Sequence, residues 1–429
     1  MVNPLPFADP CAFRFALSLR WHGRVPQLTA ASCAGDFDQR IQAARRWVAA
    51  DTATKSAQTL SIPLPSDIAR QSIQELYRAD FDLRQAMPRK ALATAWLDVY
   101  CLETGVAQIT EQAAPDIFRT LRAQADQLPP PTAAESQIGT GWCFWMELSA
   151  AEWQQATLET IKQLATETWK HWGGAAEPTL YVCRLDFAYW VTDMAAAEPV
   201  SFLIVPRGHH AQADDLLHVY LPRLLAAWFK GQKLSRVHEL AVRQMHEREE
   251  ALVRRVKEST AAKSALAQLE QAALQISTAQ LAISEQLSGG EERSHTLKLN
   301  VENAERILRL PPLRQHEAEL AAVWVEPLRL LAEQSAADLG YWRNTETLAQ
   351  RHLALLQFRA QTIYGIWQRR MTIIFGLFVV LGIPQFFPEL TDKAQPYFTW
   401  RWRLLWFFLS VVLLWTALWL AGRRTQKHP

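Results

Sequence analysis

Two uncharged stretches near the C-terminal end dominate the hydrophobic pattern of this 429-residue chain. Residues 371–388 and 404–422 contain no charged side chain, and each is close to the length that a helix needs to cross a bilayer. Because unpaired backbone groups are costly in hydrocarbon, two such runs separated by a short segment predict a helical transmembrane hairpin. The lipid bilayer is therefore the first partner that the sequence predicts.

Basic residues flank both runs and predict their orientation. Arg369 and Arg370 precede the first run, and Arg423, Arg424 and Lys427 follow the second. Positive charge collects on the cytoplasmic side of membrane helices, and the first thirty residues lack a signal-peptide pattern. We therefore expect a multi-pass protein of the cell inner membrane, with its N- and C-termini in the cytoplasm.

The first half of the chain mixes strand-like alternation with helical periodicity. Strands are predicted at residues 12–20, 93–102, 142–148, 179–188 and 200–205, and helices at 37–51, 68–87, 114–127 and 150–172. The predicted fold class is an α/β or α+β cytoplasmic domain followed by long stalk helices and the two-helix transmembrane hairpin.

Helix-forming residues prevail after Asp214. One long helix is predicted from there to residue 286, with a break at Ser288, Gly289 and Gly290 and a return helix that stops at Pro311. A last helix starts near Pro327 and meets no strong breaker before the first uncharged run.

The predicted domains follow from these patterns. In chain order they are a cytoplasmic α/β domain (1–212), a helical stalk or coiled coil (213–368), the first transmembrane helix (369–388, continuous with the stalk), an outer loop (389–403), the second transmembrane helix (404–422) and a basic tail (423–429).

Composition excludes several function classes. A net charge of +2 provides no concentrated basic surface, so we expect no nucleic-acid partner. The five cysteines form no CxxC pair, which favours small core residues in a reducing compartment over a zinc or disulfide framework. The sequence has no Walker loop, GxSxG elbow, HExxH pair or dinucleotide fingerprint, so we predict no enzyme and no cofactor, apart from a divalent cation as cargo or regulator.

In layout the chain resembles the CorA-type divalent-cation channels and transporters. The stretch MTIIFGLF from Met371 is similar to the opening of that family's first span, and Pro388, Glu389 and Leu390 look like the acidic element of its outer loop. The resemblance implies a homo-oligomer, with a pentamer expected, whose long helices line a central pore for magnesium or other ions.

The family's Gly-Met-Asn signature is missing. Gly382, Ile383 and Pro384, or else Glu389, occupy the corresponding place. Magnesium keeps a tight water shell that oxygen groups must engage, so an apolar ring would select it poorly, whereas a ring of Glu389 carboxylates would concentrate cations. An exposed loop carboxylate is the alternative role of Glu389.

The sequence predicts two further groups of candidate site residues. Thr372 and Gly376 join the predicted pore, and Arg369 and Arg370 form either a basic ring at its cytoplasmic entrance or simple interface anchors. His209, His210, Asp214 and His218 bring imidazoles and carboxylates within a dozen residues, which suits a transition metal, although a polar turn leading into a helix is the commoner explanation of such a group.

Three functions follow from these observations. The leading one is an oligomeric, CorA-like inner-membrane cation channel or transporter that is gated by its cytoplasmic domain. The second is a ligand-gated membrane effector or signalling pore of altered selectivity, controlled by a small molecule. The third is a non-conducting membrane scaffold that docks a partner through a narrow apolar seam along its long helix, from Leu234 to Leu287.

Overall fold

The computed structural model divides into two compact units, which we describe separately. The α/β unit comprises residues 1–243 and 287–340, and the helical unit comprises residues 244–286 and 341–429. The structure describes residues 7–19, 30–49, 74–80, 87–96, 99–110, 113–127, 137–173, 178–194, 198–208, 210–261, 266–386, 408–409, 412 and 415–416.

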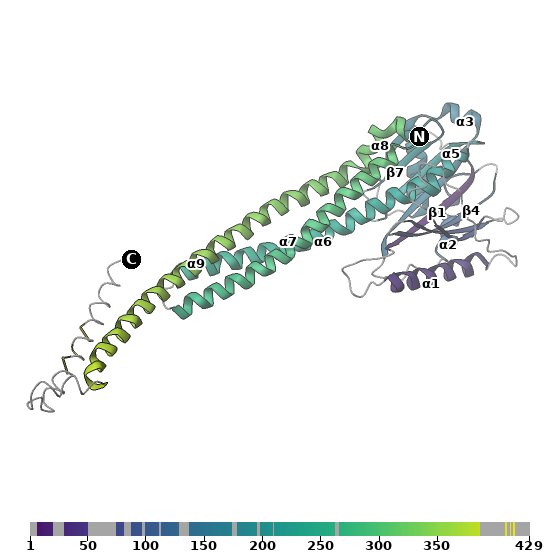
Figure 1. Ribbon diagram of the computed structural model, residues 1–429. Coiled ribbons are helices and arrows are strands. Elements are labelled where there is room, and N and C mark those ends of the chain that lie inside the picture. The colour runs from purple at the N-terminus through teal and green to yellow at the C-terminus, as the bar shows by residue number, and fades with distance from the viewer. Residues whose placement is uncertain are drawn as a thin grey trace, which may run out of the picture. The chain divides into compact units, whose positions relative to one another are not determined.

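An eight-stranded sheet forms the centre of the α/β unit (Figure 1). Its order is β2-β3-β4-β1-β5-β8-β7-β6, and its pairs are antiparallel except for the parallel pair β5 and β8. The strands are β1 (Ala8–Leu19), β2 (Gln74–Ala79), β3 (Arg89–Trp96), β4 (Val99–Ala107), β5 (Gln137–Leu148), β6 (Tyr181–Arg184), β7 (Tyr189–Asp193) and β8 (Val200–Pro206).

Helices cover both faces of this sheet. The described helices are α1 (Ala30–Ala49), α2 (Ile117–Ala125), α3 (Ala150–Gln155), α4 (Leu158–Trp172), α5 (His210–Asp215), the π-helix η1 (Leu216–Tyr220), α6 (Leu221–Ala261), α7 (Leu266–Leu308), the short 3₁₀ helix η2 (Arg314–His316), α8 (Glu317–Trp324) and α9 (Glu326–Phe386). Because side chains alternate along a strand, Phe13, Phe15 and Leu17 of β1 face one core, while Ala12 and Ala16 face the other side.

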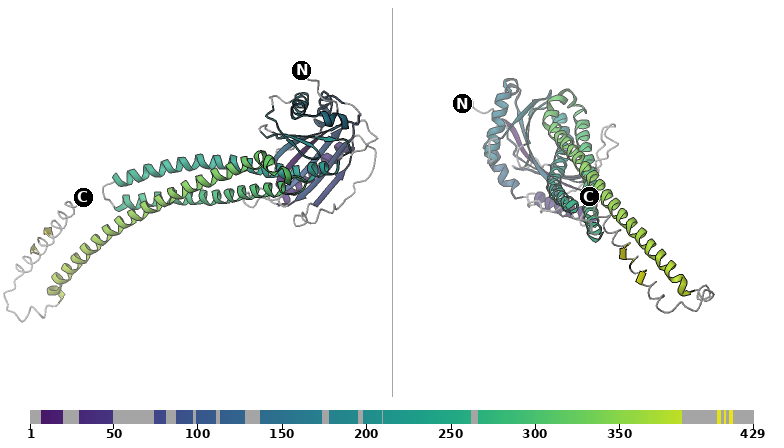
Figure 2. Two further views of the ribbon diagram at one scale, coloured as in Figure 1. Left: turned by 90° about the horizontal axis from the view of Figure 1, so that it is seen from above. Right: turned by 90° about the vertical axis from the view of Figure 1, so that its left-hand side faces the viewer.

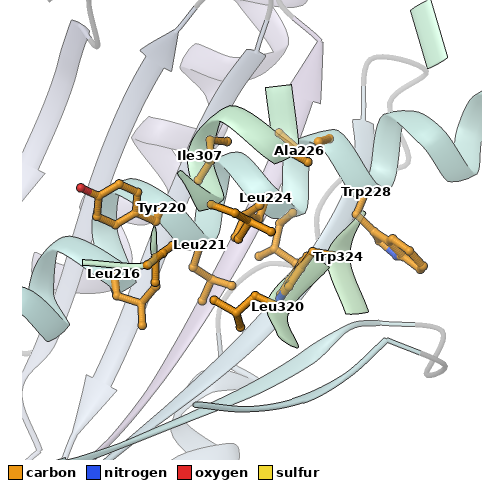
Figure 3. Packing of buried hydrophobic residues seen from close by; sticks show 14 of the residues in the cluster. Leu216, Tyr220, Leu221, Leu224, Ala226, Trp228, Ile307, Leu320 and Trp324 are labelled. Atoms are coloured by element: carbon orange, nitrogen blue, oxygen red, sulfur yellow. The ribbon is translucent and has the colours of Figure 1, made fainter. Parts of the chain in front are cut away.

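The larger core lies between the sheet and η1, α8 and the adjoining ends of α6, α7 and α9. Figure 3 shows Leu221 and Leu224 of α6 meeting Ile307 of α7, Leu320 and Trp324 in this core. The opposite face packs on α1, α2 and α4. The unit is therefore a three-layer α/β/α arrangement, which agrees with the mixed strand and helix pattern of the sequence.

A pair of glycines lets α6 approach the sheet. An added Cβ at Gly139 of β5 would overlap the ring of Phe229, and one at Gly141 would come within 3.1 Å of the Leu225 side chain. Phe229 and Leu225 are four residues apart on α6 and so share one helix face. The two glycines therefore form the floor on which this helix lies.

The helical unit joins the second part of α6, the first part of α7 and most of α9, and these helices run side by side (Figure 2). The Arg248 guanidinium donates to the carbonyl oxygen of Ala282 at 2.7 Å, and the Tyr341 hydroxyl donates to a Glu249 carboxylate oxygen at 2.7 Å. Its buried side chains include Met245, Leu252, Ile276, Ile283 and Leu356.

Several predicted elements were wrong. The helix predicted at 68–87 contains strand β2, and the single strand predicted at 93–102 is the meeting point of β3 and β4. The predicted break at Ser288 to Gly290 lies inside α7, where Gly290 is buried. Packing here outweighs the helix penalty of a glycine, about 1 kcal/mol.

The predicted transmembrane hairpin requires a correction. In the part of the chain that the structure describes, no helix combines the length and the apolar character that crossing a membrane demands. Helix α9 continues from the stalk to Phe386, as predicted.

This finding contradicts the fold class that included the hairpin, the multi-pass inner-membrane localisation and the membrane-transport character taken from the CorA resemblance. The predicted outer loop (389–403) and basic tail (423–429) lie outside the described residues. The predicted second span (404–422) does too, apart from five positions between 408 and 416.

Candidate functional site

The predicted pore residues are placed only in part. Thr372 and Gly376 are exposed on α9, and the Thr372 hydroxyl donates to the carbonyl oxygen of Gln368 at 2.9 Å. Arg369 is exposed and Arg370 is half-buried on the same helix.

The remaining pore candidates have no described side chains. Gly382, Ile383 and Pro384 have described helical backbone only, and Glu389 lies outside the described residues. The selectivity role of these positions therefore stays a prediction.

The predicted metal cluster is divided between different partners. His209 lies outside the described residues, and Asp214 is exposed on α5. His210 Nδ1 lies 3.4 Å from a carboxylate oxygen of Glu147, whereas His218 turns toward the sheet. A metal site formed by these four residues stays a prediction.

His218 belongs instead to a buried network of three charged or polar side chains. Its Nδ1 lies 2.8 Å from Glu103 Oε2 on β4, and its Nε2 lies 3.0 Å from Lys90 Nζ on β3. Lys90 Nζ also lies 3.7 Å from Glu103 Oε1. The side chains of Lys90, Glu103 and His218 are 10%, 2% and 20% exposed, so this network lies between the sheet and η1.

The protonation of His218 decides which atoms of this network donate and which accept. When the His218 ring is neutral, the Lys90 ammonium, which has only donors, donates to Nε2, and the ring carries its proton on Nδ1 and donates to Glu103. The ring of Phe13 closes the network, with its centroid 5.8 Å from Lys90 Nζ and 5.9 Å from the His218 ring. These contacts connect β1, β3 and β4 to η1.

Opposing effects set the charge of Glu103. Burial alone would raise its pKa, but the His218 ring and the Lys90 ammonium outweigh burial, and the pKa of Glu103 lies below its ordinary value. The carboxylate is therefore ionised in the core. By contrast, burial raises the pKa of Glu147, an effect that nearby His210 reduces, and burial together with Asp214 raises the pKa of Asp215.

The π-helix η1 positions His218. A π-helix inserts one extra residue into a helical turn and is frequent at functional sites. Here it precedes α6 directly, so the imidazole that contacts the sheet lies at the start of a helix with residues in both units. The arrangement is a charged joint between the sheet and α6, and its burial leaves little access for a substrate.

A second cluster joins the sheet edge to α8. Cys183 of β6, His316 of η2 and Glu319 of α8 place one potential ligand atom each within 4.8 Å of one another. The Cys183 thiol donates to Glu319 Oε2 at 3.3 Å. Burial and the neighbouring Glu319 carboxylate raise the pKa of Cys183 to about 12, so the thiol is protonated at neutral pH when no metal is bound.

Lys90, Glu103 and all three residues of this second cluster were not among the site residues predicted from the sequence. A charged residue within an otherwise apolar strand, such as Glu103 in VYCLETGVA, is the signal that could have drawn attention to the network. For the second cluster the only local signal is the spacing of His316 and Glu319 at a helix start, and nothing in the sequence connects them to Cys183.

Comparisons with models of known protein families, with curated proteins and with solved structures gave no match. The CorA resemblance therefore stays a prediction from layout and short stretches of sequence, and its membrane part is the one corrected above.

Proposed function

We propose that the protein is a non-enzymatic homo-oligomer that transmits a signal, with copies held together through α9 and an α/β unit that responds to a small ligand or an ion. The observation that carries this proposal is an exposed apolar face on α9. This function takes the place of the membrane channel that the sequence predicted.

Large apolar side chains recur along this face at helical spacing. Tyr341, Leu348 and Leu355 follow one another every seven residues, and Ile366 and Ile373 continue the same line after three further turns. Their exposed fractions lie between 40% and 59%. A seven-residue apolar repeat is the pattern with which parallel helices pack against copies of themselves.

Large aromatic side chains are also exposed around this part of α9. Phe358, Tyr364, Trp367 and Phe375 are 57–67% exposed. At about 100° per residue, Tyr364 and Phe375 lie on the side of the helix away from the repeat, so the four aromatic side chains do not form one patch with it. A second copy that presents the same face matches the repeat of Tyr341, Leu348 and Leu355.

The long helices provide the route for a signal. Helices α6, α7 and α9 each have residues in both units, and the network of Lys90, Glu103 and His218 connects the sheet to the start of α6. A ligand that changes the packing around this joint would bias a continuous helix, which is a common structural basis of switching.

Sedimentation velocity of the full chain tests the proposal. The wild type should sediment as an oligomer, and the double variant Leu348→Glu with Leu355→Glu should shift to monomer. Each introduced carboxylate costs on the order of several kcal/mol when it is desolvated in the interface between α9 helices. A double variant on α7, Leu274→Glu with Leu281→Glu, is the matched control, since these leucines are 68% and 64% exposed away from the repeat.

The control variant should keep the wild-type mass. A wild type that is monomeric at every concentration would refute self-association, and equal dissociation of both double variants would show that α9 is not the interface.

A further inference from the structure

We propose that Cys183, His316 and Glu319 form a binding site for a transition-metal dication of the Zn²⁺ type. The site joins the edge strand β6 to the start of α8, and it is independent of the self-association through α9.

The geometry fits tetrahedral coordination. Zinc binds thiolate sulfur at about 2.3 Å and imidazole nitrogen or carboxylate oxygen at about 2.0 Å, so two such ligand atoms lie roughly 3.3–3.5 Å apart. Cys183 Sγ and Glu319 Oε2 are already 3.3 Å apart, and a ring nitrogen of His316 lies within 4.8 Å of both. Small side-chain rotations would place all three around one ion.

A separate observation points to a missing ligand. Nε2 of His316 is buried and has no hydrogen-bond partner within the part of the chain that the structure describes. A buried polar atom without a partner is destabilising. A metal ion bound through this nitrogen would satisfy it.

The donor set selects the class of metal. Sulfur, nitrogen and carboxylate oxygen together suit Zn²⁺, Co²⁺ and related ions, whereas Mg²⁺ and Ca²⁺ prefer oxygen ligands alone. On binding, the Cys183 S–H proton leaves to solvent as the sulfur–metal bond forms. Three protein ligands leave one position for water or an exchangeable ligand, and Glu319, which is exposed, gives access from solvent.

Metal binding would fasten α8 to the sheet. Cys183 and Leu320 belong to the same hydrophobic core as Trp190 and Trp324, whose rings lie 5.5 Å apart at centroid. Helix α8 leads through Val325 directly into α9. The metal would therefore fix the start of α9 on the α/β unit, since a ligand that binds the folded state alone stabilises it.

Titration of the metal-free full-length protein with Co²⁺, followed by competition with Zn²⁺, tests this site. The wild type should bind a single equivalent of Co²⁺, with a thiolate-to-metal charge-transfer band in the near ultraviolet, and Zn²⁺ should displace it and raise the unfolding midpoint. Cys183→Ser should lose the band. Glu319→Gln should weaken binding at least about tenfold, since even outer-shell changes cost 10- to 100-fold.

Two control variants should bind as the wild type does. Glu317→Gln changes a carboxylate in the same helical turn, and Cys11→Ser changes a thiol of β1. Circular dichroism of each variant establishes folding. If Cys183→Ser does not fold, Glu319→Gln decides, because this side chain is exposed. A wild type without the band, a band that persists in folded Cys183→Ser, or unchanged affinity in Glu319→Gln would overturn the proposal.

Discussion

Replacing Glu103 with glutamine removes the buried carboxylate that faces both Lys90 and His218 while keeping nearly the same shape. The Glu103 side chain is 2% exposed and that of Lys90 is 10% exposed, so water cannot substitute for the lost charge. Removal of one partner from a buried ion pair costs about 3–5 kcal/mol. We expect Glu103→Gln to lower the free energy of unfolding by about 3 kcal/mol, because the amide oxygen can still accept from His218.

A double-variant cycle separates the pair from the individual side chains. In Glu103→Gln with Lys90→Met no buried ammonium faces the neutral amide, so the double variant should be more stable than Glu103→Gln alone. Urea unfolding, followed by tryptophan fluorescence, measures the free energy of unfolding of each variant. The control is Glu159→Gln on the exposed face of α4, which should change this free energy by less than about 0.5 kcal/mol. Additive losses in the cycle, or a loss in Glu103→Gln no larger than in the control, would refute the reasoning.

The same pair predicts a pH dependence. The pKa of Glu103 is lower in the folded protein than its ordinary value of 4.5. Its contribution to stability is therefore fully present above the unfolded pKa and is lost as pH falls through the folded pKa. The stability difference between wild type and Glu103→Gln should stay constant above about pH 5 and shrink below it. Taking the difference cancels the opposite contribution of Glu147, whose pKa is raised by burial. A difference that grows on acidification would contradict this assignment.

Other regions of the structure give further predictions. Gly139→Ala should destabilise the α/β unit by about 1–3 kcal/mol, because the new methyl group overlaps Phe229 of α6. Gly340→Ala has open space around the new methyl group and should stabilise α9 by about 0.5–1 kcal/mol. Urea unfolding measures both changes. Phe144→Ala, at a fully buried position between aromatic rings, should cost about 3–5 kcal/mol in the same assay. If α9 associates in parallel, Arg351 and Arg359 of neighbouring copies repel, so sedimentation should show tighter association at higher salt.

Local signals were sufficient for part of the fold. The start of α9 near Pro327 and its course as far as the first uncharged run follow from helix formers and a lack of breakers, although α9 then passes Gly382 and Pro384 to Phe386. Four of the five predicted strands overlap β1, β5, β6 and β8. These features depend on neighbouring residues, whose periodicity is visible in the sequence.

Elements that depend on distant partners were mistaken or missed. Strand β2 lies in a segment with helical periodicity and becomes a strand because it pairs with β3. Residues Gly289 and Gly290 remain helical because α7 packs there. The predicted membrane hairpin came from two apolar runs alone, and no described helix is long and apolar enough to cross a membrane.

What the sequence determined by itself was the mixed α/β character, the long helices and the lack of a recognised catalytic motif. Only the tertiary structure decided which polar residues meet, because His218 lies 128 positions from Lys90, and Cys183 lies 136 positions from Glu319. Periodicity acts over a few residues, whereas these contacts are made when the sheet and the helices pack around a shared core. His218 and Lys90 then keep the buried Glu103 ionised, and a nitrogen of His316 has no hydrogen-bond partner among the described residues, effects that no local pattern encodes.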